Sequence, residues 1–380
     1  MKKLFLLAIL AGVASTSCVK NEEVVTPDEK QQITFEPAAY KAGSRAEVTP
    51  STDDGTITFP VNQTFGSFAY YRTTAVGSEA HSVFMDNVEV AYVAAATPYW
   101  APKKTYYWPT SAGAHLDFIS YHPYNSDKTN AAVPQILDSD NQQTMTYNGF
   151  KVDAANPIDL MYSDKAMQQT RNTLHYGFTG VPTLFHHALA KLNFLVKATV
   201  LNNSATSPDA VTSWEVTVKK ISLDGIYDTG SVELKTINDH TEAKIVPWTN
   251  NTSATPNVWA NTSSTTSKVW EVSQILTTTA VPYGNGTETI ATNYFILPQA
   301  LVANQQSITI DYSVKTTAPG SQSATTDYTK TVHFVNYHSV TAWEMGKNIT
   351  YTIQIDPEGD VIHFAPAVVD WVNINGTIDF

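Results

Sequence analysis

The sequence predicts an all-β protein, and three observations carry that prediction. Short runs in which apolar and polar residues alternate recur along the chain, bounded by Pro, Gly, Asn and Asp. Residues that favour strands are frequent, including 19 Tyr and 15 Phe. Long stretches with helical periodicity are hard to find. These features are typical of a β-sandwich. The clearest alternating runs are TITFPV (56–61), HLDFISY (115–121), WEVTVKKISL (214–223), SITIDYSVK (307–315) and ITYTIQI (349–355).

The first seventeen residues predict an export signal. MKK supplies a positive start, and the apolar run LFLLAILAGVA is too short for a membrane-spanning helix, which needs about 20 residues. The small residues of ASTSC lead to Cys18, the only cysteine in the chain. This pattern resembles a bacterial lipobox, so we expect residues 1–17 to be removed and Cys18 to be lipidated. A plain signal peptide with an incidental cysteine is the alternative.

Lipidation at Cys18 would anchor the protein to the outer membrane. Each buried CH₂ of an acyl chain such as palmitate contributes about 0.8 kcal/mol, and two chains suffice for stable anchoring. A single cysteine excludes an intrachain disulfide, so the fold must depend on core burial. The polar stretch that follows, VKNEEVVTPDEKQQ, is expected to be a flexible tether. Its acidic run resembles the surface-export signal of Bacteroidetes lipoproteins, so we expect the protein on the cell surface.

Length and charge bound the domain count and the class of partner. The residues after the signal are too many for one ordinary domain and suit two. The formal net charge is −12, and the only arginines are Arg45, Arg72 and Arg171. Lysines are scattered and form no basic stripe. The sequence therefore argues against binding to nucleic acid or to an anionic membrane surface.

Two segments with ambiguous patterns are predicted to be β-structure. FHHALAKL (185–192) could form a helix, but apolar residues then alternate from Ala188 to Val200, which predicts one long strand. IYDTGSVEL (226–234) matches the active-site loop of aspartic proteases, which need a second such loop that this chain lacks. We therefore predict a hairpin that turns at Asp228-Thr229-Gly230.

No enzyme motif is assembled in the sequence. His186 and His187 are neighbours, so in a strand they should point to opposite faces and cannot share a metal. HExxH, GxSxG, P-loop and GxGxxG patterns are absent. We therefore predict a protein without enzymatic activity, metal or cofactor.

The aromatic run YWAPKKTYYWP (99–109) leaves a second function open. Trp100 and Trp108 could stack on sugar rings, which would make the protein a monomeric carbohydrate-binding surface lipoprotein. In a sandwich such residues more often fill the core.

Several stretches, in this order along the chain, together resemble the Bacteroidetes fimbrillin family, the type V pilins and their Mfa-like relatives. They are ITFEP, SRAEV, YYWPTSAGAHLDFISYHPY, DLMYS, FHHALAKLNFLV, ISLDGIYDTGSVEL, YFILPQ and IHFAPAVVDWV. The resemblance implies two tandem transthyretin-like β-sandwich domains. It places the boundary near GFTGVP (177–182), giving domains at 46–182 and 183–380. The polar run at 201–210 is the rival boundary.

The resemblance also implies a structural, accessory or anchor subunit of a cell-surface pilus (fimbria), with a role in adhesion. Polymerising members are cut after an arginine by a trypsin-like or arginine-specific protease, which removes the first strand. On this sequence the cut falls between Arg45 and Ala46, and residues 18–45 become the propeptide. The strand to be lost is QITFEPAAY (32–40), with Ile33 and Phe35 on one face and Pro37 suited to an edge strand.

A strand from a neighbouring subunit would then fill the opened groove by β-augmentation. The last twenty residues, 361–380, offer two donor candidates. Ile362, Phe364 and Val368 alternate in one, and Ile378 and Phe380 end the other. The alternative is that 361–372 is the last strand of its own domain. The expected partners are other pilus subunits, the protease, the outer membrane, and a host or glycan ligand.

Overall fold

A computed structural model describes the chain over residues 30–39, 57–73, 81–139, 142–153, 156–172, 179–202, 211–234, 245–246, 258–261, 265–284, 294–336, 340–358 and 361–370. In these residues almost all regular structure is β-strand, which confirms the predicted all-β class. The one helical element among them is a short 3₁₀ turn at Phe334–Asn336. No helix within the described ranges has the length and hydropathy of a membrane span.

Nine strands from the N-terminal half and β15 from the C-terminal half form a ten-stranded sheet, called here the barrel sheet. Its order is β15-β10-β6-β3-β4-β5-β1-β11-β9, β2 adds to β1, and a further pairing joins β9 to β6. That pairing closes β6, β3, β4, β5, β1, β11 and β9 into a ring. The strand bounds are β1 (Phe35–Ala39), β2 (Ile57–Thr58), β3 (Thr64–Arg72), β4 (Ser82–Val93), β5 (Tyr99–Pro102), β6 (His115–His122), β9 (Met161–Ser163), β10 (Lys165–Gln169), β11 (Val181–His187) and β15 (Ile245–Val246).

A four-stranded sheet, called here the bridging sheet, combines strands from both halves of the sequence. Its order is β16-β14-β8-β7, with bounds β7 (Gln135–Ser139), β8 (Gln142–Lys151), β14 (Thr229–Leu234) and β16 (Ala260–Asn261). A core that includes Tyr121, Tyr147, Val232 and Trp259 joins this sheet to the barrel sheet. Segments beyond the expected boundary at 182/183 therefore pair with strands that precede it.

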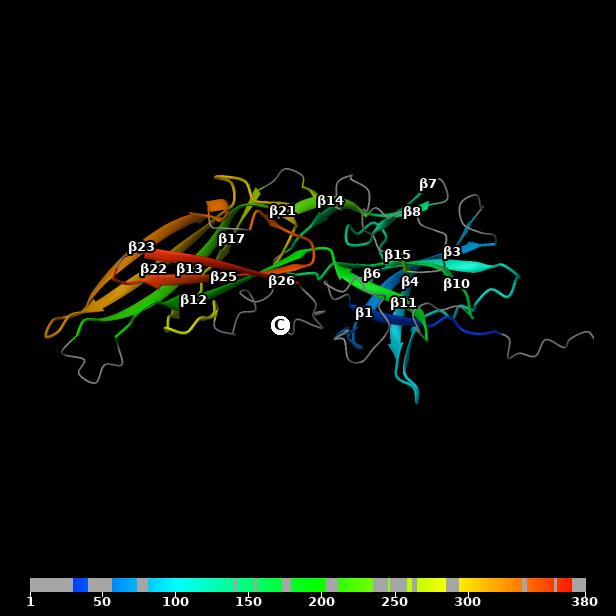
Figure 1. Cartoon of the computed structure of the whole chain (residues 1–380), viewed down its shortest axis with the longest axis horizontal. Coiled ribbons are helices and arrows are strands. Elements are labelled where there is room, and N and C mark those ends of the chain that lie inside the picture. The colour runs from blue at the N-terminus through cyan, green and yellow to red at the C-terminus, as the bar shows by residue number, and fades with distance from the viewer. Residues whose placement is uncertain are drawn as a thin grey trace, which may run out of the picture.

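Two five-stranded sheets form a sandwich at the other end of the molecule (Figure 1). One has the order β19-β12-β25-β26 with β20 added, and the other has the order β17-β13-β22-β23 with β18 added. The bounds are β12 (Ala190–Ala198), β13 (Ser213–Tyr227), β17 (Thr265–Trp270), β18 (Gln274–Ile275), β19 (Val281–Pro282), β20 (Tyr294–Ile296), β22 (Ser307–Thr317), β23 (Ala324–His333), β25 (Lys347–Asp356) and β26 (Val361–Asp370). A small sheet pairs β21 (Gln299–Ala300) with β24 (Ala342–Trp343).

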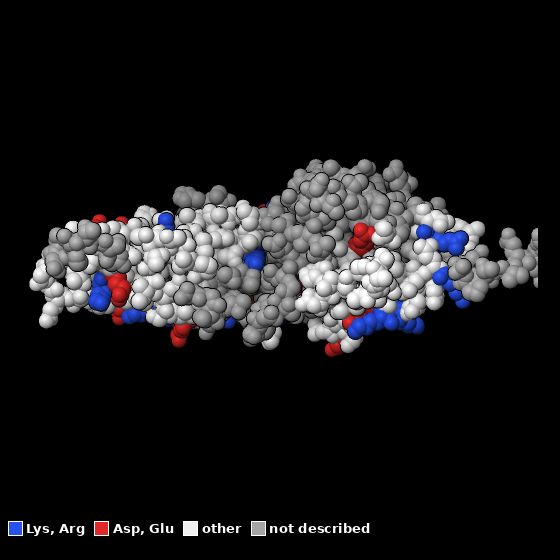
Figure 2. All heavy atoms as spheres, turned by 90° about the horizontal axis from the view of Figure 1, so that it is seen from below, with Lys and Arg blue, Asp and Glu red and all other residues white. Residues whose placement is uncertain are grey.

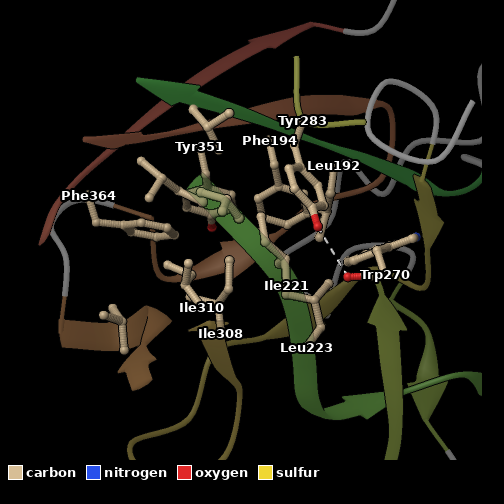
Figure 3. Close-up of a cluster of buried hydrophobic side chains, with 14 of the residues drawn as sticks. Leu192, Phe194, Ile221, Leu223, Trp270, Tyr283, Ile308, Ile310, Tyr351 and Phe364 are labelled. Atoms are coloured by element: carbon tan, nitrogen blue, oxygen red, sulfur yellow. Dashed lines mark hydrogen bonds between the residues drawn. The ribbon is translucent and has the colours of Figure 1, made fainter. Parts of the chain in front are cut away.

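Aromatic and aliphatic side chains from both C-terminal sheets fill the space between them (Figure 3). Tyr351 stacks between Phe194 and Phe364, at ring-centroid distances of 6.0 and 4.8 Å. The Tyr283 hydroxyl donates to the Trp270 carbonyl oxygen at 3.3 Å, so its polar end is satisfied within the core.

Two sequence predictions about strand connections were wrong in detail. The strand expected over 188–200 begins at Ala190 and ends at Ala198, because the chain crosses at 188–189 from β11 of the barrel sheet to β12 of a C-terminal sheet. Within β12 the predicted alternation is confirmed, since every second residue from Ala190 to Ala198 is buried. The hairpin at Asp228-Thr229-Gly230 does not form. β13 pairs with β22 and β17, whereas β14 pairs with β8 and β16, so the chain crosses between sheets at Asp228.

Candidate functional site

The β1 strand lies inside the barrel sheet and is bonded on both sides. It runs parallel to β11, with Phe35 opposite Val181 and Ala39 opposite Phe185. On its other side Phe35 pairs with Trp100 of β5, and Ala38 pairs with Thr58 of β2. The expectation from Pro37 that this strand occupies a sheet edge was therefore wrong.

The position of Pro37 explains why an internal strand tolerates proline. The Val181 N–H donates to the Thr34 carbonyl oxygen at 2.8 Å, so the backbone groups of even-numbered residues face β11. The nitrogen of Pro37 consequently faces the other side. On that side Pro37 lies between Phe35, which pairs with β5, and Ala38, which pairs with β2. Its missing N–H leaves no ladder hydrogen bond broken.

The residues before β1 extend the pairing along the segment 106–108. The Ile33 N–H donates to the Tyr106 carbonyl oxygen at 2.9 Å, and the Trp108 N–H donates to the Gln31 carbonyl oxygen at 3.0 Å. These bonds flank an antiparallel bridge between Gln32 and Tyr107. Together, residues 31–39 and their partners in 106–108, β5, β2 and β11 are called here the β1 site.

The side chains of the predicted removable strand are buried in the barrel core. Ile33 is 0% and Phe35 3% exposed. The Phe35 ring makes edge-on contacts with Phe65 and Phe118, both at a centroid distance of 5.6 Å. Burying a large apolar side chain stabilises a fold by about 1.5–3 kcal/mol, so Ile33 and Phe35 together contribute about 3–6 kcal/mol.

Two contacts set the fit of β1 against the start of β11. A Cβ atom on Gly180 would lie 2.7 Å from the Phe35 carbonyl carbon, so only glycine allows the two backbones to approach this closely. A Glu36 carboxylate oxygen accepts hydrogen bonds from the N–H and the hydroxyl of Thr179, at 2.7 and 3.0 Å.

The arginines differ in their exposure. Arg72 is 1% exposed, and its Nε donates to Asp117 Oδ2 at 2.6 Å. A buried, ion-paired arginine in the middle of a sheet is not open to a protease, whereas Arg171 is exposed after β10. Arg45, Ala46 and Cys18 lie outside the described residues.

Arg72 belongs to a buried charged cluster with Asp117, Lys165 and Gln143. Arg72 Nη2 donates to the Gln143 side-chain oxygen at 3.0 Å, and Lys165 Nζ donates to the Gln143 carbonyl oxygen. Burial lowers the pKa of the Lys165 amine to about 7, against the opposing attraction of Asp117. Sequence reasoning missed this cluster, because its members lie on β3, β6, β8 and β10, which are far apart in the sequence and come together only in the folded chain.

His186 and His187 bind different carboxylates. His186 Nε2 lies 2.9 Å from Asp164 Oδ1, and His187 Nδ1 lies 2.7 Å from Asp159 Oδ1. Neither aspartate was identified from the sequence. The part of the chain that the structure describes contains no group of three or more metal-binding side chains.

Burial contradicts Trp100 and Trp108 as a sugar-stacking surface. They are 8% and 4% exposed and belong to the same core as Phe35. A sugar ring stacks on an exposed aromatic face, and in this run Tyr107 is the exposed ring, at 46%. On the face shown in Figure 2 the charged side chains lie singly or in small groups with uncharged surface between them.

The first donor candidate lies in β26, at the edge of a C-terminal sheet. β26 pairs with β25 over its whole length, and within the described residues it has no second strand neighbour. Phe364 is 6% exposed, Ile362 is half-buried and Val368 is 46% exposed. In this monomer 361–370 is thus the last strand of its own sheet, as the alternative expected. Ile378 and Phe380 lie outside the described residues.

The chain matches the model of a family described as fimbrillin-like over residues 44–371. Among solved structures it is similar to a fimbrial protein from Bacteroides vulgatus, with 17% identity and a TM-score of 0.52, covering 90% of this chain and 99% of that one. It is also similar to a protein from Bacteroides uniformis named for cell adhesion, with 17% identity and a TM-score of 0.44, covering 90% and 98%. No curated protein matches.

Proposed function

Because this chain belongs to the fimbrillin-like family, we propose that it is a structural or accessory subunit of a surface pilus that assembles by protease-triggered strand exchange. The observation that carries the proposal is the β1 site. One short segment, close in sequence to Arg45, completes a closed sheet and fills its core. Removal of that segment breaks the ring between β5 and β11 and exposes two rows of backbone donors and acceptors.

The opened site has the properties that β-augmentation requires. Its sides offer unpaired backbone groups, and its floor offers the rings of Phe65, Phe118 and Phe185. An incoming strand would satisfy the backbone groups, and every second side chain would enter the core. Apolar side chains of the incoming strand would be buried where Ile33 and Phe35 were, and this burial would hold the two subunits together without a disulfide.

Processing and location complete the proposal. An arginine-specific protease cuts between Arg45 and Ala46, and the lipid at Cys18 holds the precursor at the outer membrane until then. After the cut, β1 is retained only by non-covalent contacts, so a strand from another subunit can displace it. Assembled subunits form part of the fimbrium and contribute to adhesion to a host or glycan ligand.

The test is to treat the purified precursor with an arginine-specific protease. We expect a new N-terminus at Ala46 and oligomers that resist mild denaturation. Arg45→Gln should prevent both, whereas the matched variant Arg171→Gln should leave both unchanged. Cutting at Arg45 that yields only monomers would refute the polymerising role. An accessory subunit that keeps its first strand would behave in that way.

The adhesive role has its own test. Cells that carry the gene and cells that lack it are compared for attachment to host cells and to a broad glycan array. Equal attachment of the two strains would refute the adhesive role and leave the assembly role standing.

A further inference from the structure

A buried amine and a buried carboxamide meet between the barrel sheet and the bridging sheet. Lys165 of β10 and Gln143 of β8 are each 2% exposed. Lys165 Nζ donates a hydrogen bond to the carbonyl oxygen of Gln143. The two residues belong to different sheets, and neither the strand exchange nor the lipid anchor proposed above uses their contact.

The Gln143 carboxamide is contacted at both of its polar atoms. Arg72 Nη2 donates to Gln143 Oε1 at 3.0 Å, and His81 Nε2 lies 3.3 Å from Gln143 Nε2. A cation at the oxygen draws electrons away from the carbonyl carbon and stabilises the negative charge that develops on the oxygen during attack. The carbon of this amide is therefore a better electrophile than that of an exposed glutamine.

The charges around Lys165 favour an uncharged, nucleophilic amine. Arg72 Nε donates to Asp117 Oδ2 at 2.6 Å, so these two residues already neutralise each other. A second cation buried beside Arg72 has to leave water, and loss of its proton avoids that cost. Burial accordingly lowers the pKa of the Lys165 amine to about 7, although Asp117 attracts the charged form. Above neutral pH the amine therefore carries the lone pair that a nucleophile needs.

We propose that Lys165 and Gln143 become joined by an intramolecular isopeptide bond in the folded protein. The bond between Lys165 Nζ and Gln143 Cδ forms and the bond between Gln143 Cδ and Nε2 breaks, so one molecule of ammonia leaves. Nζ gives up one proton, which passes to the departing nitrogen by way of His81 Nε2. The atoms balance without an oxidant or a co-reactant.

Each neighbour of the reacting pair has a separate task. The hydrogen bond to the Gln143 carbonyl holds Nζ beside the residue that it attacks, and such proximity accelerates a reaction between two groups. Arg72 binds the oxygen of the carboxamide, and Asp117 positions Arg72. Asp117 is itself fixed, because its Oδ1 accepts a hydrogen bond from the Gln168 N–H at 2.7 Å. These groups meet only once β3, β6, β8 and β10 have folded, so the bond forms after folding.

The bond gives a chain with one cysteine a covalent brace. It ties β8 of the bridging sheet to β10 of the barrel sheet and closes a ring of residues 143–165. Closing a loop stabilises a fold mainly by restricting the unfolded chain, as a disulfide does. The bond also ends the titration of Lys165, because an amide nitrogen takes up no proton near neutral pH. A rise of stability with pH is therefore a property of newly made protein and is lost as the bond forms.

Peptide mapping by mass spectrometry tests the bond. The precursor is purified at pH 6, where the amine is mostly protonated, then held folded at pH 9 and digested with trypsin at intervals. Trypsin does not cut after an acylated lysine, so the bond appears as a branched peptide in which 129–151 is joined to 152–171. Its mass is that of the two linear peptides less one ammonia. Fragment spectra locate the link.

The controls separate the buried cluster from general amine chemistry. Lys165→Met and Gln143→Leu should each abolish the branched peptide. Lys191→Met is the matched variant, because it removes a half-buried lysine outside the cluster, and it should leave the yield unchanged. Wild-type protein that is unfolded in urea during the incubation should gain no further branched peptide.

We expect the gain of branched peptide to be about tenfold or more larger in folded wild type than in the urea-unfolded sample, because only folding brings the two groups together. Linear peptides alone from folded wild type at every time would overturn the proposal. Loss of ammonia that fragment spectra locate elsewhere, for instance at Asn148-Gly149, would overturn it as well. Equal gains in folded and unfolded protein would overturn the role of the cluster. None of these outcomes depends on whether the chain is cut or assembles.

Discussion

Truncating Phe35 to alanine should release β1 from the cut precursor much faster than normal. The Phe35 ring is 3% exposed and contacts Phe65 and Phe118 at 5.6 Å. Removing a packed Phe side chain costs about 3–5 kcal/mol. Because about 1.4 kcal/mol corresponds to a factor of ten, the affinity of the cut segment for its site should fall by a hundredfold or more.

The assay follows the segment that ends at Arg45 after proteolysis. Its dissociation rate is measured by mass spectrometry of fractions taken at intervals, for wild type, Phe35→Ala and Thr34→Ala. Thr34 is the matched control, because it is on the same segment with its side chain on the opposite face. The uncut Phe35→Ala precursor should also lose about 3–5 kcal/mol of unfolding free energy in denaturant titration.

Faster dissociation for Phe35→Ala than for Thr34→Ala would support the view that Phe35 anchors β1. Equal dissociation rates for all three proteins would refute that reasoning. It would mean that the backbone ladders, rather than the buried ring, limit release.

Two further changes give distinct outcomes. Gly180→Ala should destabilise the precursor by about 1–3 kcal/mol in denaturant titration, because the added Cβ would clash with the Phe35 backbone. Unchanged stability would contradict the close approach of the Gly180 and Phe35 backbones. Burial lowers the pKa of Lys165 to about 7, so the unfolded chain binds more protons above that pH, and stability should rise with pH from about 7 toward 10.5. Lys165→Met should remove that rise in titrations at pH 7, 8 and 9, and parallel curves for the two proteins would count against it.

The sequence predicted the positions of strands well where one face of the strand is buried and the other is exposed to solvent. The alternation from Ala190 to Ala198 shows this, because burial of every second residue is a local consequence of the pleat. The burial of Ile33 and Phe35 on one face of the first strand was anticipated in the same way.

Neighbouring strands could not be predicted, because periodicity shows which face is buried and not which strand lies alongside. The turn residues at Asp228-Thr229-Gly230 suit a hairpin, yet the chain uses them to cross between sheets. Pro37 suggested an edge, yet its place between two short partners lets it stand inside the sheet. The aspartates that bind His186 and His187 and the Arg72–Asp117 pair depend on the same non-local pairing.

The bridging sheet gives this protein a mechanical property that a pair of domains on a linker would lack. The chain passes between the two ends of the molecule at Ala188–Leu189, at Asp228, and again between β16 and β17. The ladder between β8 and β14 adds backbone hydrogen bonds from Thr229–Lys151 to Leu234–Met145. A pull along the long axis of Figure 1 is therefore shared by several covalent crossings and a hydrogen-bonded ladder loaded together. Such a junction should resist extension of the subunit. Elongation of a fibre of these subunits under load would then have to occur at the contacts between subunits.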